Sequence, residues 1–304
     1  MHKRWSAWSD FNSAQYVFNL MQNFPKNNLV IDVRDSEEFG RIHIHNSINI
    51  PYSDEYSELP GIQELREHVV SGQSLFDKRK RMLLIIVFSP QAVVFAREVY
   101  YILRRDKCRE VHILEEELNV FASKYSFLCE GELMPMFKCP FDGYPSEILP
   151  FKLYLGNYHH AEDSTVIDNL KITHIVNATN SFEAKFRSKG VVYLRLGVED
   201  LETEDFTRHF SLAYRFLREA LENDKHRVLV HCARGISRSA TIIILYFMKA
   251  QNMTYDQAFK FVKKHREIIC PNEGFMNQLR SWELDEIDSS PILENKSECR
   301  VMIE

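Results

Sequence analysis

The chain has 304 residues, and 45% of them are hydrophobic, which is enough to fill the cores of two compact domains. A formal net charge of −5 argues against a nucleic-acid-binding protein. Six cysteines without a CxxC pair or zinc-like spacing, and no recognisable signal peptide, indicate a reducing compartment. We therefore expect a cytoplasmic or nuclear protein with no nucleic-acid partner and no membrane association.

The first half of the chain alternates strand and helix patterns. A helical pattern covers 92–105, and residues rich in proline and glycine without periodicity follow this half. Strands that alternate with helices indicate a parallel sheet with helices on its faces. The predicted strands are short apolar runs at 28–35, 48–52, 81–89 and 110–114.

The second half repeats the alternation, with strands expected at 172–179, 191–198 and 227–231. The apolar segment 241–248 is too short to cross a bilayer and is typical of a buried helix. A capping box, Thr254-x-x-Gln257, predicts a helix that buries Ala258, Phe259 and Val262. One face of a further helix over 206–221 is indicated by Phe206, Phe210, Ala213, Leu217 and Ala220.

The chain is therefore predicted to contain two α/β domains. We place the first domain at 1–133, a linker at 134–145, the second domain at 146–290 and a polar tail at 291–304.

The stretch VLVHCARGISRS, residues 228–239, places a cysteine between a strand and a helix. Such a loop points backbone N–H groups at one spot, and the helix dipole adds partial positive charge, so the loop suits a phosphate group. Cys232 lies in the same field, which favours its thiolate. Arg238 can hold two phosphate oxygens, and Gly235 permits the turn. The predicted phosphate-binding residues are Ala233, Arg234, Gly235, Ile236, Ser237 and Arg238.

These residues match the H-C-x5-R-[ST] pattern, so the loop resembles that of cysteine-based protein phosphatases, most of all the dual-specificity branch. Residues 146–157 and 271–279 are similar to further segments of MAP kinase phosphatase catalytic domains. The resemblance implies that His231 tunes the thiolate and that Ser239 donates a hydrogen bond to the sulfur. His231 as an ordinary core histidine and Ser239 as a helix cap are the alternatives.

A leaving alkoxide or phenoxide needs a proton from a general acid. The resemblance assigns this role to Asp200, within the acidic segment LGVEDLETEDF. A solvated acidic loop is the alternative, because four more acids share this segment: Glu199, Glu202, Glu204 and Asp205. Asn272 is expected either to position the hydrolysis end of the site or to act in a turn after Pro271.

The predicted reaction is attack of Cys232 on phosphorus, protonation of the leaving oxygen by Asp200, and hydrolysis of the cysteinyl-phosphate. No metal and no cofactor are expected. Arg234 adds a second positive charge to the loop, which suggests either a preference for acidic phosphosubstrates or, as we favour here, a solvent-facing salt bridge.

Residues 31–51 and 109–129 resemble the first and last segments of the rhodanese fold. Where a sulfurtransferase has its cysteine, this chain has Ser89, and Pro90 removes an amide from the loop. Sulfur transfer is therefore rejected. A non-catalytic rhodanese-like domain before a dual-specificity domain is the arrangement of MAP kinase phosphatases, which implies phosphorylated protein substrates, with a MAP kinase as candidate.

In that family a basic cluster after the INIP strand docks the kinase. The present chain differs, because the segment after its INIP strand is acidic. The basic run 77–81 is the nearest substitute, although an ordinary charged turn is the favoured interpretation. The chain also resembles serine/threonine/tyrosine-interacting-like pseudophosphatases, which lack the nucleophile that Cys232 provides here. We therefore predict a phosphatase for phosphotyrosine and phosphoserine/threonine, with a phosphoprotein-binding scaffold as the alternative. A phosphatase for lipid or RNA phosphates is disfavoured by the negative charge and the lack of loop lysines.

Overall fold

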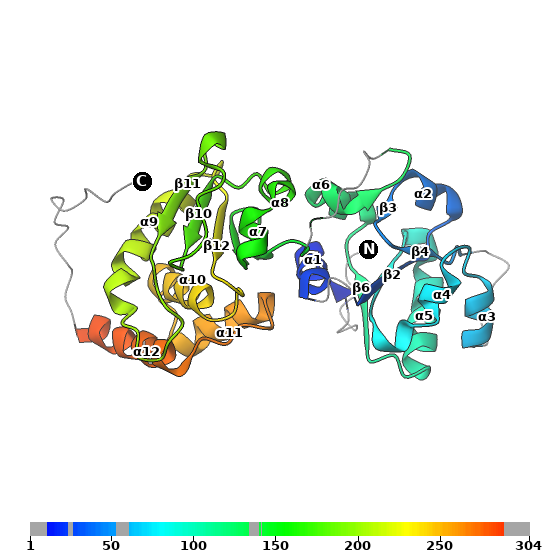
Figure 1. Cartoon of the computed structure of the whole chain (residues 1–304). Coiled ribbons are helices and arrows are strands. Elements are labelled where there is room, and N and C mark those ends of the chain that lie inside the picture. The colour runs from blue at the N-terminus through cyan, green and yellow to red at the C-terminus, as the bar shows by residue number, and fades with distance from the viewer. Residues whose placement is uncertain (1–10, 24–26, 53–60, 134–139, 141, 289–304) are drawn as a thin grey trace. The chain divides into compact units, whose positions relative to one another are not determined.

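The computed structural model describes residues 11–23, 27–52, 61–133, 140 and 142–288. The chain divides into two compact units, Met1–Cys139 and Pro140–Glu304 (Figure 1). Most of the predicted linker and the whole predicted tail lie outside the described residues. No helix in the described ranges has the length and apolarity that crossing a membrane requires.

The first unit is built on a parallel five-stranded sheet with the order β1-β6-β5-β2-β4. The four predicted strands are present, and β5 is buried along its whole length, as expected for a central parallel strand. The strands are β1 (Phe11–Asn12), β2 (Asn28–Asp32), β4 (Ile48–Asn49), β5 (Leu83–Val87) and β6 (Glu110–Leu114).

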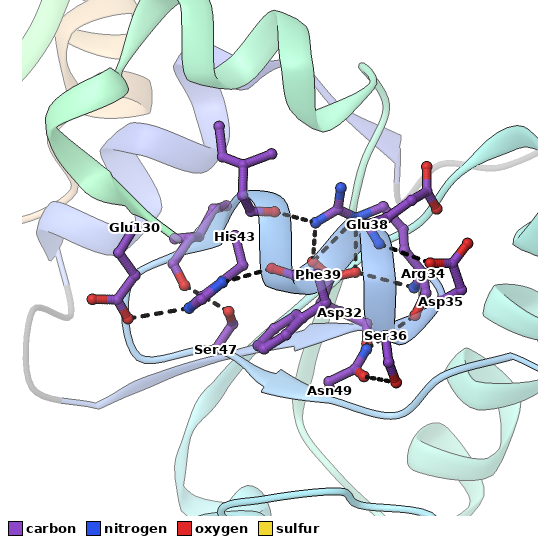
Figure 2. Close-up of polar contacts among 12 residues, drawn as sticks. Asp32, Arg34, Asp35, Ser36, Glu38, Phe39, His43, Ser47, Asn49 and Glu130 are labelled. Atoms are coloured by element: carbon purple, nitrogen blue, oxygen red, sulfur yellow. Dashed lines mark hydrogen bonds and ion pairs between the residues drawn. The ribbon is translucent and has the colours of Figure 1, made fainter. Parts of the chain in front are cut away.

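Helices of the first unit include the predicted one, which forms α5 and begins after a 3-10 turn at Pro90–Ala92. A separate antiparallel pair joins β3 (His43–Ile44) to β7 (Cys129–Glu130), where Glu130 lies 3.3 Å from the His43 ring nitrogen (Figure 2). The helices are α1 (Ala14–Asn23), α2 (Ser36–Arg41), α3 (Ile62–Glu67), α4 (Gln73–Phe76), α5 (Val93–Arg105) and α6 (Leu118–Lys124).

The second unit holds a five-stranded sheet with the order β11-β10-β12-β9-β8, in which only the β8–β9 pair is antiparallel. Its three predicted parallel strands are confirmed. The strands are β8 (Ser146–Leu149), β9 (Leu153–Gly156), β10 (His174–Asn177), β11 (Val192–Arg195) and β12 (Val228–His231).

Helices α9, α11 and α12 pack around the central helix α10, and Figure 1 shows α7 and α8 on the other side of the sheet. The apolar segment 241–248 lies within α10 and is almost wholly buried, as predicted. The helices are α7 (Tyr158–Glu162), α8 (Ser164–Asn169), α9 (Phe210–Glu222), α10 (Arg238–Ala250), α11 (Tyr255–His265) and α12 (Glu273–Asp288).

Two helix predictions need correction. Phe206 is buried as expected but lies before α9, because Asp205 accepts hydrogen bonds from the backbone and hydroxyl of Thr207 and so starts a 3-10 turn. The Thr254 capping box of α11 is confirmed, yet Phe259 is only half-buried. The buried face instead follows Tyr255, at the helical spacing of Ala258 and Val262, while Lys263 covers the Phe259 ring.

Candidate active site

The candidate nucleophile lies where β12 ends and α10 begins. Parallel register sets His231, the last residue of β12, against Asn177 of β10 and Gly156 of β9. The carboxyl ends of three strands therefore meet beside the loop 232–237, the position at which open parallel sheets bind ligands.

Cys232 is 1% exposed, and its sulfur accepts hydrogen bonds from the Gly235 N–H and the Ser239 hydroxyl, each at 3.2 Å. Burial by itself raises the pKa of the thiol. The Ser239 hydroxyl and the backbone N–H groups of Ser239, Ile236 and Gly235 outweigh it, so that the pKa is lowered overall. The loop thus stabilises a thiolate, and hydrogen bonds are the main cause.

The carbonyl groups of the loop are held outward by bonds from its surroundings. The Ala233 carbonyl accepts from the Tyr158 N–H at 3.4 Å, and the Ile236 carbonyl accepts from the Cys270 N–H at 2.9 Å. The Gly235 carbonyl accepts from Arg266 Nε at 2.9 Å. Because these carbonyls point away, the loop N–H groups are free to face the sulfur and a bound phosphate.

Gly235 adopts φ +69°, and a Cβ at this position would lie 2.5 Å from the Gly156 carbonyl oxygen. Both the left-handed backbone and the close approach therefore require glycine. The predicted role of Gly235 in the turn agrees with this geometry.

Arg266 is a supporting residue that the sequence analysis missed. It is 4% exposed, and besides Gly235 it donates to the Ser146 hydroxyl at 3.1 Å. Burial lowers its pKa to about 10, so it stays charged at neutral pH. No local pattern links Arg266 to a loop 31 residues earlier and a strand 120 residues earlier.

Asp200 lies at the Ser237 end of the loop. Its Oδ1 accepts from the Ser237 hydroxyl at 2.7 Å and from Asn272 Nδ2 at 3.0 Å. Arg238 Nε lies 3.5 Å from Oδ2 of Asp200, and Arg238 Nη1 donates to the Val198 carbonyl at 3.0 Å. The Asp200 side chain is 38% exposed, so it can meet a substrate oxygen at the mouth of the site.

Asn272 performs both of the tasks proposed for it. Its Nδ2 group holds Asp200, while its Oδ1 accepts from the Phe275 N–H at 2.9 Å in the first turn of α12. Its backbone N–H also donates to the Ser237 hydroxyl at 3.2 Å.

Three of the four other acids of this segment have partners elsewhere. Glu199 accepts from Asn180, Glu204 pairs with Arg208, and Asp205 binds Thr207. Asp200 is therefore the acid whose contacts, within the described ranges, reach the loop.

His231 fits the alternative of a buried core histidine. Burial lowers its pKa to about 4, so its ring is neutral at pH 7 and brings no positive charge to Cys232. Arg234 is exposed and makes no hydrogen bond or ion pair with a described residue. Among the described residues, the salt bridge favoured for Arg234 is therefore not found.

The corresponding loop of the first unit is chemically different. Ser89 is buried at the end of β5, and Pro90 starts the 3-10 turn that leads into α5. A cavity of about 340 Å³ beside Ser89 is lined by Asp35, Glu37 and Glu38 among others, so its charge opposes anion binding.

Asp32 and Arg34 form a buried ion pair at 2.7 Å, and Arg34 also donates to the Ile42 carbonyl (Figure 2). Asn49 donates to the carbonyls of both residues. These three residues of the rhodanese-like segment 31–51 fix the backbone, which is a structural role.

The basic run 77–81 is only partly paired. Asp77 pairs with Arg66 at 2.7 Å, and Arg79 and Lys80 share Asp106. Lys78 and Arg81 are exposed, so the run keeps positive charge at the surface and both interpretations of it stay open.

Two family models match these two units. The rhodanese-like domain model matches residues 14–124, and the dual specificity phosphatase catalytic domain model matches residues 153–285. Dual specificity protein phosphatase 1 of Homo sapiens is 30% identical over 295 residues, which cover 84% of this chain and 78% of that protein. The chain belongs to the dual specificity protein phosphatases.

A second relative has the same two-domain description. A Dictyostelium discoideum protein named "Probable rhodanese domain-containing dual specificity protein phosphatase" is 28% identical over 324 residues, which cover 88% of this chain and 67% of that protein. The predicted combination of a rhodanese-like domain with a dual specificity phosphatase domain, both α/β, is thus confirmed.

Among solved structures, the human tyrosine phosphatase-like serine/threonine/tyrosine-interacting protein matches with 35% identity and a TM-score of 0.42. The match covers 47% of this chain and 98% of that one. In the present chain, Cys232 lies at the base of the loop between β12 and α10.

Proposed function

We propose that the chain hydrolyses phosphotyrosine and phosphoserine/threonine in proteins through a cysteinyl-phosphate intermediate. The observation that carries the proposal is the arrangement around one loop. A thiol with a lowered pKa lies at the base of the loop, Asp200 is held by Ser237 and Asn272, and Arg238 lies 3.5 Å from Asp200. A protein that only binds phosphate would need the loop but neither the nucleophile nor the acid.

In the first step the Cys232 thiolate attacks phosphorus, and the bond from phosphorus to the tyrosine, serine or threonine oxygen breaks. The loop N–H groups and Arg238 hold the three remaining phosphoryl oxygens. The departing oxygen takes the bonding electron pair and receives the proton of Asp200.

In the second step a water molecule attacks the cysteinyl-phosphate, and the Asp200 carboxylate takes a proton from it. The S–P bond breaks, inorganic phosphate leaves, and the thiolate is restored. The Ser239 hydroxyl, 3.2 Å from the sulfur, donates to the thiolate as it leaves.

The test is steady-state phosphate release from a doubly phosphorylated kinase activation-loop peptide, with reductant and without metal. Wild type is compared with Cys232→Ser, for which we expect turnover to fall by at least about 10⁴-fold while the peptide still binds. If wild type binds the peptide but releases no phosphate, the phosphoprotein-binding scaffold is correct instead.

We also propose that a MAP kinase is a protein substrate and that the chain acts in the cytoplasm and nucleus. The support is the two-domain arrangement shared with MAP kinase phosphatases. The measurement is kcat/KM for an intact phosphorylated MAP kinase against that for its isolated activation-loop peptide. A preference of less than about twofold for the intact kinase would contradict docking, and imaging of the tagged chain tests location.

A further inference from the structure

Two aromatic rings lie beside the start of the phosphate loop. Tyr158, the first residue of α7, stacks on Phe182 with ring centroids 4.6 Å apart and planes 7° from parallel. The Tyr158 N–H donates to the Ala233 carbonyl, and the Phe182 ring centroid lies 6.5 Å from that of His231. Both aromatic residues are half-buried, so part of each ring stays accessible.

Phe182 is held in a backbone conformation that it would not adopt by itself. Its φ is +74°, in the left-handed region that residues with a Cβ rarely occupy. Its carbonyl accepts from Asn177 Nδ2 and from Arg195 Nη2. Asn177 is fixed in turn at the end of β10, because its Oδ1 accepts from the N–H and the hydroxyl of Thr179.

Backbone strain of this kind persists only where neighbouring groups enforce it, and it gathers at ligand sites. Here Asn177 and Arg195, from neighbouring strands, hold the carbonyl of Phe182, and the Phe182 ring lies against Tyr158 near His231. A glycine would adopt the same φ without strain, so the backbone conformation alone does not explain a phenylalanine at this position. We infer that the position of the ring is what matters.

Tyr158 and the candidate acid contact opposite ends of the loop. Tyr158 adjoins Ala233 at the start of the loop, whereas Asp200 and Asn272 adjoin Ser237 at its end. A phosphate bound over Cys232 has to direct its leaving oxygen to Asp200, so the carbon atoms of the phosphorylated side chain pass between these two ends.

We propose that Tyr158 and Phe182 form an aromatic wall that contacts the phosphorylated residue and makes the site favour phosphotyrosine over phosphothreonine. A phosphotyrosine ring can stack on this wall or meet it edge to face, an attraction beyond that of buried area. The short aliphatic chain of phosphothreonine cannot. The proposal rests on the proposed function and names the substrate class of the same site.

The test compares two peptides of one sequence that differ only in phosphotyrosine or phosphothreonine. Phe182→Gly removes the ring and leaves a residue that adopts φ +74° freely, so the fold is retained. We expect kcat/KM for the phosphotyrosine peptide to fall about tenfold, mainly through KM, and that for the phosphothreonine peptide to change by less than twofold. Phe182→Leu, which keeps apolar bulk, should behave in the same way.

The matched control is Phe259→Leu, a half-buried aromatic on α11 that should leave both peptides within twofold of wild type. Equal losses on both peptides in Phe182→Gly, or no loss on either, would overturn the wall. In a Cys232→Ser background, the ratio of the Kd values for the two peptides is measured with and without Phe182→Gly. If wild type shows no turnover, the proposed function is refuted, but this Kd ratio still tests whether the aromatic wall favours phosphotyrosine.

Discussion

In both units a buried parallel strand runs into a loop that leads to a helix of 13 residues, α5 in the first unit and α10 in the second. The loop after β5 closes on itself: the Ala92 N–H donates to the Ser89 carbonyl, and Pro90 has no N–H to offer. The loop after β12 is held open, because Tyr158, Arg266 and Cys270 bind its carbonyls from outside.

The difference shows that a strand, a loop and a helix are not sufficient for phosphate chemistry. The backbone N–H groups must also be turned inward, and in the second unit this depends on residues outside the loop. The following changes would break or sharpen this comparison.

Among these four changes, loss of the acid should have the largest effect. We expect Asp200→Asn to lower kcat by about 10²- to 10³-fold, because the leaving oxygen no longer receives a proton. The loss should shrink with an activated aryl phosphate, whose leaving group needs no proton. Glu199→Gln, one residue away and bonded to Asn180, is the control and should stay within twofold. A matching loss in the control would show that the whole acidic segment acts together.

Gly235→Ala should lower the free energy of unfolding of the second unit by about 3 kcal/mol, because its Cβ would meet the Gly156 carbonyl in a left-handed conformation. Gly190→Ala shares the positive φ but has open space around the Cβ, so we expect about 1 kcal/mol. Hydrogen exchange of the β12 amides measures both. Equal costs would mean that the loop tolerates the extra carbon.

Ser239→Ala should slow alkylation of Cys232 about tenfold at pH 6. Loss of the hydroxyl raises the thiol pKa, so the thiolate appears only at higher pH and the rate profile moves to higher pH. Peptide mapping separates the cysteines. Cys129 is the internal control, because burial raises its pKa to about 12 and it should stay unreactive. An unchanged profile would show that the backbone N–H groups alone stabilise the thiolate.

Ser89→Cys should have the smallest effect, with no sulfurtransferase activity and only slow alkylation at neutral pH. In the first loop Pro90 has no N–H, the Ala92 N–H is bonded to the Ser89 carbonyl, and carboxylates line the cavity. Adding Pro90→Gly should speed the alkylation by restoring one amide. Sulfur transfer by the single variant would show that the cysteine alone defines the difference between the loops.

Sequence reasoning predicted the features that depend on neighbours along the chain. The strands, the Thr254 capping box and the placement of Cys232 and Gly235 in the loop follow from local pattern, while the bond from Ser239 to the sulfur follows from the family resemblance. It could not find Arg266 or the strained Phe182, because their roles depend on partners from distant strands. It misjudged Phe259, since periodicity defines a helix face only to within one position.

The bond from Arg266 to Ser146 has a practical consequence for isolating the phosphatase domain. The family match begins at residue 153, but Ser146 in β8 shares with Gly235 the guanidinium that holds the loop open. A recombinant fragment cut at 153 would leave this buried cation without one of its partners and β9 without its antiparallel neighbour. Cloning boundaries should therefore start at Pro140, where the second compact unit begins.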